Sequence, residues 1–313
     1  MKTMKWLLKR EVWENRGLLI FSNLALAGIL VIISLILIRN LGENWQLISI
    51  QNNGASMSVQ TTMAGNFTYG AIQGFRLLFS ILLPLVMYGY CVNCLSDERK
   101  NRSILFWKSL PLSDGMTVAS KLIFALMLLP LASVLAWFAV SLVFMLITVS
   151  AYALHGTNVF SSLFLNPRLW GVFWQTLEFY PLYLAWALPS VAWLMLISSL
   201  LRNRPGMWAL LVPIGILALT AFVNSQLGHL FTDLRGFSYV VVGRSLFSIV
   251  PGTWNFGHGA MSAARSDADL VRGFMNPADF PSYELFYSAD LWLGVLAAVV
   301  MILVAIRIRR WQE

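Results

Sequence analysis

The sequence predicts an all-α membrane protein that crosses the bilayer six times. Hydrophobic residues make up 58% of the 313-residue chain and charged residues only 12%, against roughly 25% charged residues in a soluble domain. Six long uncharged runs meet or approach the about 20 residues that a helix needs to cross a hydrocarbon core of about 30 Å. These runs are Leu18–Ile38, Leu77–Leu95, Leu122–Leu154, Phe179–Leu201, Met207–Val223 and Leu291–Ile306.

Basic residues predict the orientation of these spans. With six crossings, one side of the membrane receives 15 of the 22 lysines and arginines, on much the shorter total loop length: Lys2, Lys5, Lys9, Arg10, Arg16, Arg99, Lys100, Arg102, Lys108, Lys121, Arg202, Arg204, Arg307, Arg309 and Arg310. Lysine and arginine concentrate in cytoplasmic loops, so both termini are expected on the cytoplasmic side of a bacterial inner membrane. The net charge of +8 then reflects membrane topology, and no nucleic-acid partner is expected.

Residues 1–17 are expected to form an amphipathic helix along the inner membrane surface. At 100° per residue its lysines share one face and its leucines the opposite face, while Trp6 and Trp13 share a boundary position suited to the depth of the lipid headgroups. The residues assigned to this interfacial helix are Trp6, Lys9, Arg10, Glu11 and Trp13. No small-residue cleavage site follows Ile38, so we expect an uncleaved anchor.

The remaining segments follow from the run boundaries. Spans one and two occupy 18–95 around a polar outer loop at 39–74, a cytoplasmic loop covers 96–121, spans three to five cover 122–225, an external subdomain covers 226–289, and span six with a cytoplasmic tail covers 290–313. Phe237–Val250 is apolar but short and carries Arg244 at its middle. A seventh span here would move the C-terminal arginines outside, so we expect an interfacial, re-entrant or folded external segment.

Catalytic motifs are missing from the sequence. No G-x-x-x-x-G-K-[ST] phosphate loop and no H-E-x-x-H occurs, so the chain is not expected to be an enzyme or to bind ATP or a metal by those routes. Cys91 and Cys94 form a C-x-x-C pair without a second pair at metal spacing, which favours packing cysteines.

Glu178 is the acid nearest to a predicted span interior, at the outer end of the fourth run. A carboxylate in a membrane is costly and therefore a candidate for a substrate or proton path, although an edge position would also let it reach water. Prolines lie in or near several spans and can kink the helices. They are Pro84, Pro130, Pro181, Pro189 and Pro213.

The stretch DERKNRSILFWKSLPLSDG, Asp97–Gly115, differs from the rest of the chain. Mixed charges precede the apolar residues Ile104–Trp107, Pro111 stops any helix before it, and Ser113 can cap the next one. An exposed apolar group beside mixed charges is typical of a helix that docks onto a partner. The alternative is a solvated loop with an aromatic anchor at the membrane surface.

Together with the start WLLKREVWENRG and six spans, this stretch resembles the permease subunits of type-two ABC exporters. The resemblance covers the whole chain in topology and is motif-specific at residues 5–17 and 97–122. Glu98 and Arg99 match the family's acidic–basic start, Leu110–Ser113 match its turn, and Lys121 matches the basic residue that opens the third span. The resemblance implies a coupling helix that enters a groove on a separate ATPase. The residues assigned to it are Asp97, Glu98, Arg99, Lys100, Arg102, Ile104, Leu105, Phe106, Trp107, Lys108, Pro111 and Asp114.

The resemblance further implies that two permease subunits, identical or paralogous, pair with two ATPase subunits, which carry the ATP and Mg²⁺. No cofactor is expected in this chain. Its 13 tryptophans and 20 phenylalanines favour an amphipathic cargo, such as a peptide, an antibiotic or a lipid-like molecule. The alternatives are a secondary transporter, which needs paired ionisable groups within the membrane, and a non-transporting scaffold. Only Glu178 and Arg76 approach such a pair.

Overall fold

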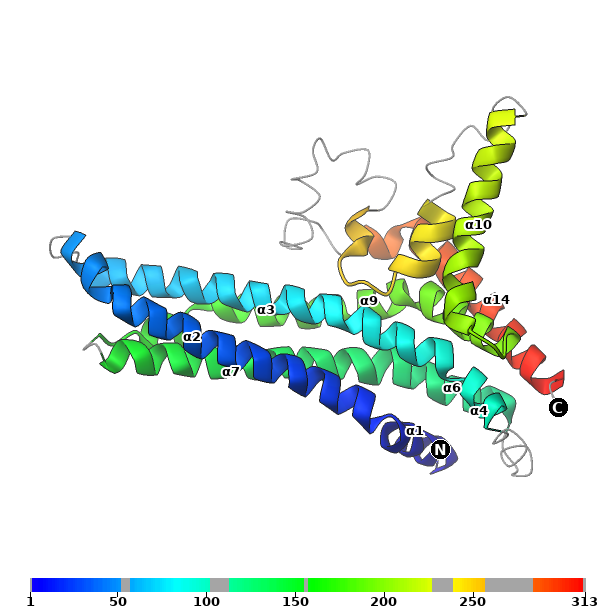
Figure 1. The fold of residues 1–313 in the computed structure, drawn as a ribbon, viewed down its shortest axis with the longest axis horizontal. Coiled ribbons are helices and arrows are strands. Elements are labelled where there is room, and N and C mark those ends of the chain that lie inside the picture. Colours follow the sequence, from blue (N-terminus) through cyan, green and yellow to red (C-terminus); the bar gives the residue numbers. More distant parts are fainter. Residues whose placement is uncertain are drawn as a thin grey trace. The chain divides into compact units, whose positions relative to one another are not determined.

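The computed structural model describes residues 2–51, 57–101, 113–154, 157–226, 239–256 and 284–311, whose path is drawn in Figure 1. Over these residues every regular element is a helix. Six helical stretches are long and apolar enough to cross a membrane, and each contains one of the predicted runs or nearly all of it. They are Gly17–Arg39, Thr62–Lys100, Asp114–Leu154, Phe160–Leu200, Pro205–Gln226 and Ala289–Trp311. The prediction of an all-α chain with six membrane-length helices is confirmed for the described part of the chain.

The helical elements run in this order: α1 Lys2–Glu14, η1 Gly17–Phe21, α2 Ser22–Gln51, α3 Met57–Asn93, α4 Ser96–Lys100, α6 Asp114–Ile123, η2 Phe124–Leu128, α7 Leu129–Leu154, α8 Phe160–Phe164, α9 Pro167–Leu200, α10 Pro205–Gln226, η3 Tyr239–Phe247, η4 Thr253–Phe256, η6 Glu284–Tyr287 and α14 Ala289–Trp311. Here η1, η2 and η3 are π-helical, and η4 and η6 are short 3₁₀ helices. Residues 226–289, expected as an external subdomain, contain η3, η4 and η6 among their described parts.

The segment 39–74, expected as an outer loop, is helical where it is described. Helix α2 continues to Gln51, and α3 already begins at Met57. The sequence between Arg39 and Gly74 is polar but contains no proline. Asn, Gln, Ser and Thr cost well under 1 kcal/mol each in a helix, so polarity alone does not end one.

Helix α9 also begins earlier than the run Phe179–Leu201 indicated. Asn166 accepts a hydrogen bond from the backbone N–H of Arg168 at 3.0 Å through its side chain, and Pro167 is the first helical residue. Asparagine at the N-cap followed by proline is a strong start signal for a helix. The residues from Pro167 onward therefore form the first turn of a 34-residue helix.

The prolines lie within or beside the long helices as expected. Pro84 is inside α3, Pro181 and Pro189 are inside α9, and Pro213 is inside α10. Pro130 is the second residue of α7, directly after the π-helical segment η2. A wider turn at that point accommodates the missing N–H and the ring of Pro130.

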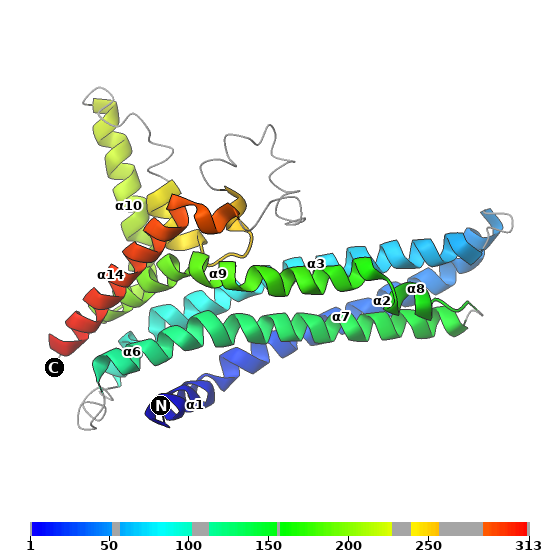
Figure 2. The ribbon, with the colours of Figure 1, turned by 180° about the vertical axis from the view of Figure 1, so that it is seen from behind.

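The chain divides into two compact units, which we describe separately. Unit 2 comprises Leu19–Ser80 and Leu131–Glu178. Its buried core includes Trp137 of α7, whose indole N–H donates to the carbonyl of Ile72 at 3.1 Å and whose ring packs 4.9 Å from that of Phe173. Figure 2 shows the short helix α8 where the chain passes from α7 to α9.

Unit 1 comprises Met1–Leu18, Ile81–Pro130 and Phe179–Glu313. Within it α6 packs against both α1 and α14, and η3 packs against α10, as Figure 1 shows for the yellow segment beside α10. The segment 239–256 is docked on one face of α9. Tyr183 donates to the carbonyl of Ile249 at 2.8 Å, and the Ser190 hydroxyl donates to the carbonyl of Arg244 at 2.9 Å.

Arg244, at the centre of this segment, is buried. Its guanidinium lies 3.9 Å from the ring centre of Trp186 and donates to the carbonyl of Asp290, in the first turn of α14, at 3.2 Å. A methyl group at Gly294 of α14 would collide with this guanidinium. The segment is not among the membrane-length helices of the described residues, and its interfacial, re-entrant or external placement stays a prediction.

Candidate functional site: a buried ionic cluster at both ends of residues 101–113

Two helix ends flank the segment that the sequence singled out. Helix α4 ends at Lys100, and α6 begins at Asp114 after Ser113, whose hydroxyl accepts from the backbone N–H of Met116 at 3.3 Å. Each helix carries acidic residues in its first turn, where a helix dipole favours negative charge. Glu98 and Asp114 thus stand on the two sides of the segment.

Glu98 is buried among three cations. One carboxylate oxygen lies 2.7 Å from a guanidinium nitrogen of Arg309, and the other lies 3.1 Å from Lys121 Nζ and 3.3 Å from a guanidinium nitrogen of Arg10. These cations come from α14, α6 and α1 respectively. A single carboxylate therefore joins three helices that are distant in the sequence.

Glu11 of α1 is the second carboxylate of the cluster, and its side chain is only 1% exposed. One oxygen accepts from Lys121 Nζ at 2.9 Å and from Arg10 at 3.1 Å. The other accepts from the hydroxyl of Tyr90 near the end of α3 at 2.9 Å. Glu11 thereby ties α1 to α3, which precedes α4, and to α6, which follows residues 101–113.

Arg309 closes the cluster from α14. Its guanidinium bonds Glu98 at 2.7 Å and Asp114 at 3.3 Å, and its side chain is 4% exposed. One cation thus holds both ends of residues 101–113. The cluster's named members, Arg10, Lys121 and Arg309 with Glu11, Glu98 and Asp114, balance in charge. Such balance offsets the cost of removing ions from water.

A second set of bonds fixes α4 to the end of α9. The guanidinium of Arg99 donates to the carbonyls of Ser198 at 2.6 Å and Leu201 at 2.9 Å. The Ser198 hydroxyl accepts from the backbone N–H groups of Leu95 at 3.2 Å and Ser96 at 3.0 Å. Arg99 satisfies carbonyls that the end of a helix leaves without intrahelical partners, and its charge suits that end of the helix dipole.

Several predicted site residues therefore come together, and others do not. Arg10, Glu11, Glu98 and Asp114 form the cluster, and Arg99 binds beside it. Asp97 and Lys100 pair with each other at 3.0 Å away from it. Trp6 and Trp13 are exposed on α1, with Lys9 Nζ 5.2 Å from the Trp6 ring centre. The predicted residues Arg102, Ile104, Leu105, Phe106, Trp107, Lys108 and Pro111 lie outside the described residues.

Sequence reasoning missed Arg309 and Tyr90 as members of the site. Arg309 was counted only for topology, although a charged residue in the last turn of a long apolar helix is a signal for a buried ion pair. Tyr90 gave no comparable signal among the aromatic residues of its span. Cys91 and Cys94 are free and buried near the cluster, and the described residues hold no group of three or more residues suited to a metal.

A second polar region runs along α3 and α9 in unit 2. Thr62, Asn66, Tyr69, Gln73, Arg76 and Ser80 follow one another at alternating spacings of four and three residues. That spacing places them on one face of α3. Four of them, Thr62, Asn66, Tyr69 and Gln73, lie within the segment 39–74 that was expected to be a loop, so the helical spacing was not considered there.

Contacts within unit 2 set the register of α9 against α3. Arg168 of α9 donates a hydrogen bond to Asn66 of α3. Six residues further along α3, the carbonyl of Ile72 accepts a hydrogen bond from the Trp137 indole, whose ring packs against Phe173 of α9. Both helices therefore advance in the same direction, and Glu178 falls level with Arg76. Glu178 is exposed and lies inside α9 rather than at its end, so two opposite charges stand at one level of two membrane-length helices.

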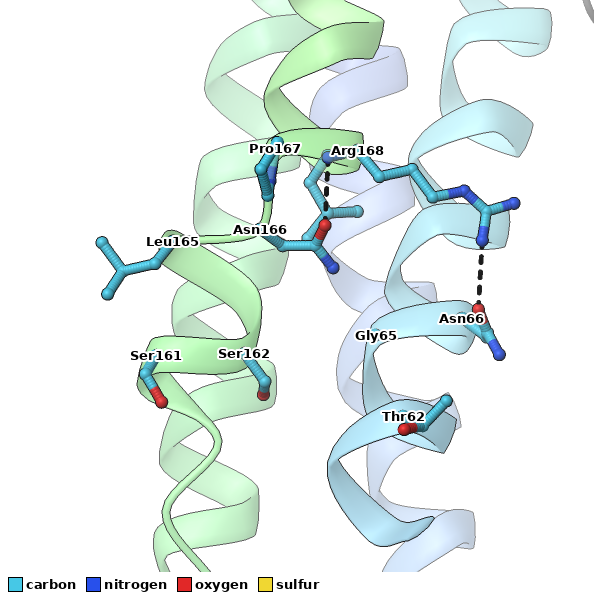
Figure 3. Close-up of a pocket in the computed structure, with 10 residues that line it drawn as sticks. Thr62, Gly65, Asn66, Ser161, Ser162, Leu165, Asn166, Pro167 and Arg168 are labelled. Atoms are coloured by element: carbon cyan, nitrogen blue, oxygen red, sulfur yellow. Dashed lines mark hydrogen bonds between the residues drawn. The ribbon is translucent and has the colours of Figure 1, made fainter. Parts of the chain in front are cut away.

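A pocket of about 340 Å³ opens at the start of α9. In Figure 3 the side chain of Arg168 reaches from α9 to Asn66 of α3, while Ser161 and Ser162 approach from α8. The Arg168 guanidinium donates to the Asn66 side-chain oxygen at 3.3 Å and lies 4.0 Å from the ring centre of Tyr69.

No family model, curated protein or solved structure matches this chain.

Proposed function

We propose that this chain is the permease subunit of a type-two ABC exporter, which moves an amphipathic substrate outward with a separate ATPase. The observation that carries the proposal is the ionic cluster around Glu98 and Arg309. A segment that receives force from a partner must be joined firmly to the helices that it moves. Here both ends of residues 101–113 are ion-paired to α14, and one end also to α1 and α6.

The cluster suits the transmission of a displacement. Removing one member of a buried ion pair costs about 3–5 kcal/mol, so the groups favour moving together over separating. A push on residues 101–113 would therefore shift α1, α6 and α14 as one body. In the proposed complex, two such permeases pair with two ATPase subunits, which hold ATP and Mg²⁺, and closure of the ATPase pair supplies the push.

The same contacts support the proposed topology in a bacterial inner membrane. Glu11 near the start of the chain bonds Lys121, and Arg309 of α14 bonds Glu98. These contacts support a placement of the N-terminal helix, the segment 96–121 and the end of α14 on one side of the bilayer. The excess of positive charge there favours the cytoplasmic side.

Co-purification with an ATPase tests this function directly. Phe106→Ala and Trp107→Ala remove the aromatic anchors expected at the partner's groove, where a central anchor contributes about 2 kcal/mol or more, or roughly thirtyfold in affinity. We expect at least one of them to lose both the co-purified ATPase and substrate-stimulated ATP turnover at normal permease levels. The matched control is Phe160→Ala in α8, which should keep both signals. Wild-type behaviour of all three variants would contradict the proposed function.

The second candidate, a secondary transporter, is favoured by one observation. Arg76 and Glu178 lie level on neighbouring membrane-length helices, as ion-coupled transporters require of their ionisable groups. Transport assays separate the two candidates. Export that stops with an ATPase-deficient partner and survives dissipation of the proton gradient supports the exporter, and the opposite pattern supports the secondary transporter.

A further inference from the structure

We propose that the pocket at the start of α9 binds the anionic group of an amphipathic molecule, with Arg168 as the charged contact. The inference deepens the proposed function, on which it rests for the role of this molecule as cargo. The ligand class is a phosphate or carboxylate attached to an apolar chain. Binding itself needs no ATPase and can therefore be tested separately.

The pocket is built for hydrogen bonding. Thr62 and Asn66 line it from α3, Ser161 and Ser162 from α8, and Asn166 precedes α9 (Figure 3). Hydroxyl and amide groups can donate hydrogen bonds to an oxyanion. Asn166 uses its side-chain oxygen to cap α9, which leaves its amide NH₂ facing the space beside Gly65, 3.7 Å from where a Cβ would stand there. Donors thus come from three separate elements.

Arg168 is held in place before any ligand arrives. Asn66 accepts one of its five N–H groups at 3.3 Å, and the Tyr69 ring supports the guanidinium plane at 4.0 Å. A guanidinium holds its N–H donors in a fixed planar arrangement, so the N–H groups that do not bond Asn66 can reach a second acceptor. Stacking on an aromatic ring reduces the rotamer freedom that binding would otherwise remove.

The charge balance of this region favours an anion. Arg76 and Glu178 lie level with each other and offset each other's charge, whereas the acceptors around Arg168 in the pocket are neutral. The net charge of the polar region along α3 and α9 is therefore positive and concentrated at Arg168. A phosphate or carboxylate would complete this balance, and a cation would be repelled.

Apolar and polar surfaces meet at the pocket, as an amphiphile requires. Leu165 lines the pocket with 73% of its surface exposed, and Met63 beside Thr62 is half-exposed. In the other direction the polar face of α3 continues to Gln73, whose side-chain oxygen is buried without a hydrogen-bond partner among the described residues. Buried acceptors of this kind are usually satisfied by water or ligand.

The test measures lipid binding to the purified full-length chain in detergent, without any ATPase. The probe is a short-chain phosphatidic acid, compared with the phosphatidylcholine of the same chains and with inorganic phosphate as competitor. We expect phosphatidic acid to bind at least tenfold more tightly than phosphatidylcholine. Arg168→Gln should remove that preference, since a charged hydrogen bond contributes about 1.5–3 kcal/mol.

Two further variants keep the test decisive. Asn66→Asp places a carboxylate on Arg168 without changing side-chain size, and it should weaken phosphatidic acid binding even if Arg168→Gln fails to fold. Arg204→Gln, an exposed arginine in unit 1, should bind like wild type. Equal affinity for both lipids, or wild-type affinity in Arg168→Gln and Asn66→Asp, would overturn the proposal. Competition by inorganic phosphate at the same concentration would also overturn it, because the ligand would then be a free anion.

Discussion

At the scale of single residues, the sequence identified Glu98 as a candidate site residue, but its surroundings in the structure differ from those expected. It was assigned to a surface that docks onto a partner, because mixed charges precede an apolar group in Asp97–Gly115. The structure buries it against Arg10, Lys121 and Arg309. Local sequence shows which residues are charged but not which distant charges meet them, and Arg309 follows Glu98 by more than 200 residues. The pairing was therefore beyond sequence reasoning.

We expect Glu98→Gln to destabilise the purified chain. The substitution leaves three cations facing one fewer carboxylate, and breaking a buried pair costs about 3–5 kcal/mol. Thermal unfolding in detergent measures the loss. Glu14→Gln is the matched control, because Glu14 pairs with Arg10 on α1 but is 53% exposed, and it should cost about 1 kcal/mol or less.

A double variant tests independently whether the charge balance of the same cluster stabilises the fold. Glu98→Gln combined with Lys121→Met restores the balance between positive and negative groups, so it should recover part of the stability that Glu98→Gln loses. Equal melting temperatures for Glu98→Gln and Glu14→Gln would show that the cluster does not stabilise the fold.

At the scale of elements, the apolar runs located the helices but not their ends. Helix existence depends on long uncharged runs, which the sequence displays directly. Helix ends depend on caps and on neighbours, and polarity is a poor guide to them. The loop expected at 39–74 is helical where it is described, and α9 starts at Pro167, where an Asn–Pro signal was present but was not used. The polar face of α3 was not predicted, because most of its residues lie within the segment 39–74.

The docking of 239–256 on α9 predicts protection from proteolysis. Trypsin cleaves after arginine, and Arg244 is buried. We expect slow cleavage after Arg244 in the purified native chain. Tyr183→Phe with Ser190→Ala removes two side-chain bonds to the segment, each contributing about 1 kcal/mol, and should speed that cleavage roughly thirtyfold.

The control is Tyr180→Phe, which removes a hydroxyl from the same helix but one that bonds Met127 instead. Mass spectrometry of the fragments follows the Arg244 site alone. Rapid cleavage there in the wild-type chain would mean that the segment is loose despite its contacts.

At the scale of the whole molecule, composition and run length were sufficient for the fold class. A chain with 58% hydrophobic residues in six long runs has few alternatives to a helical membrane protein. The side on which each loop lies follows from the charge distribution and stays a prediction. In the proposed function, the identity of the cargo depends on a few side chains at one pocket, and the sequence offered only its aromatic content as a guide to it.

Cysteine labelling tests the predicted topology. Ser113→Cys and Ser161→Cys are exposed positions that the six-span topology puts on opposite sides of the membrane. An impermeant maleimide should label Ser161→Cys in intact cells and Ser113→Cys only after permeabilisation. The native Cys91 and Cys94 are buried and should give a low background. Labelling of Ser113→Cys in intact cells would contradict the topology.

The position of Arg309 in the chain has a consequence for biosynthesis. A ribosome completes α1, α4 and α6 long before it reaches Arg309 in α14. Until then the cluster contains Glu11, Glu98 and Asp114 against only Arg10 and Lys121, which leaves one carboxylate charge uncompensated. The cluster can therefore reach its charge balance only after α14, the last of these helices in the chain, has been synthesised. An unfinished chain that lacks α14 thus differs from a finished one in the electrostatics of the ends of residues 101–113, to which the proposed function assigns the contact with the ATPase.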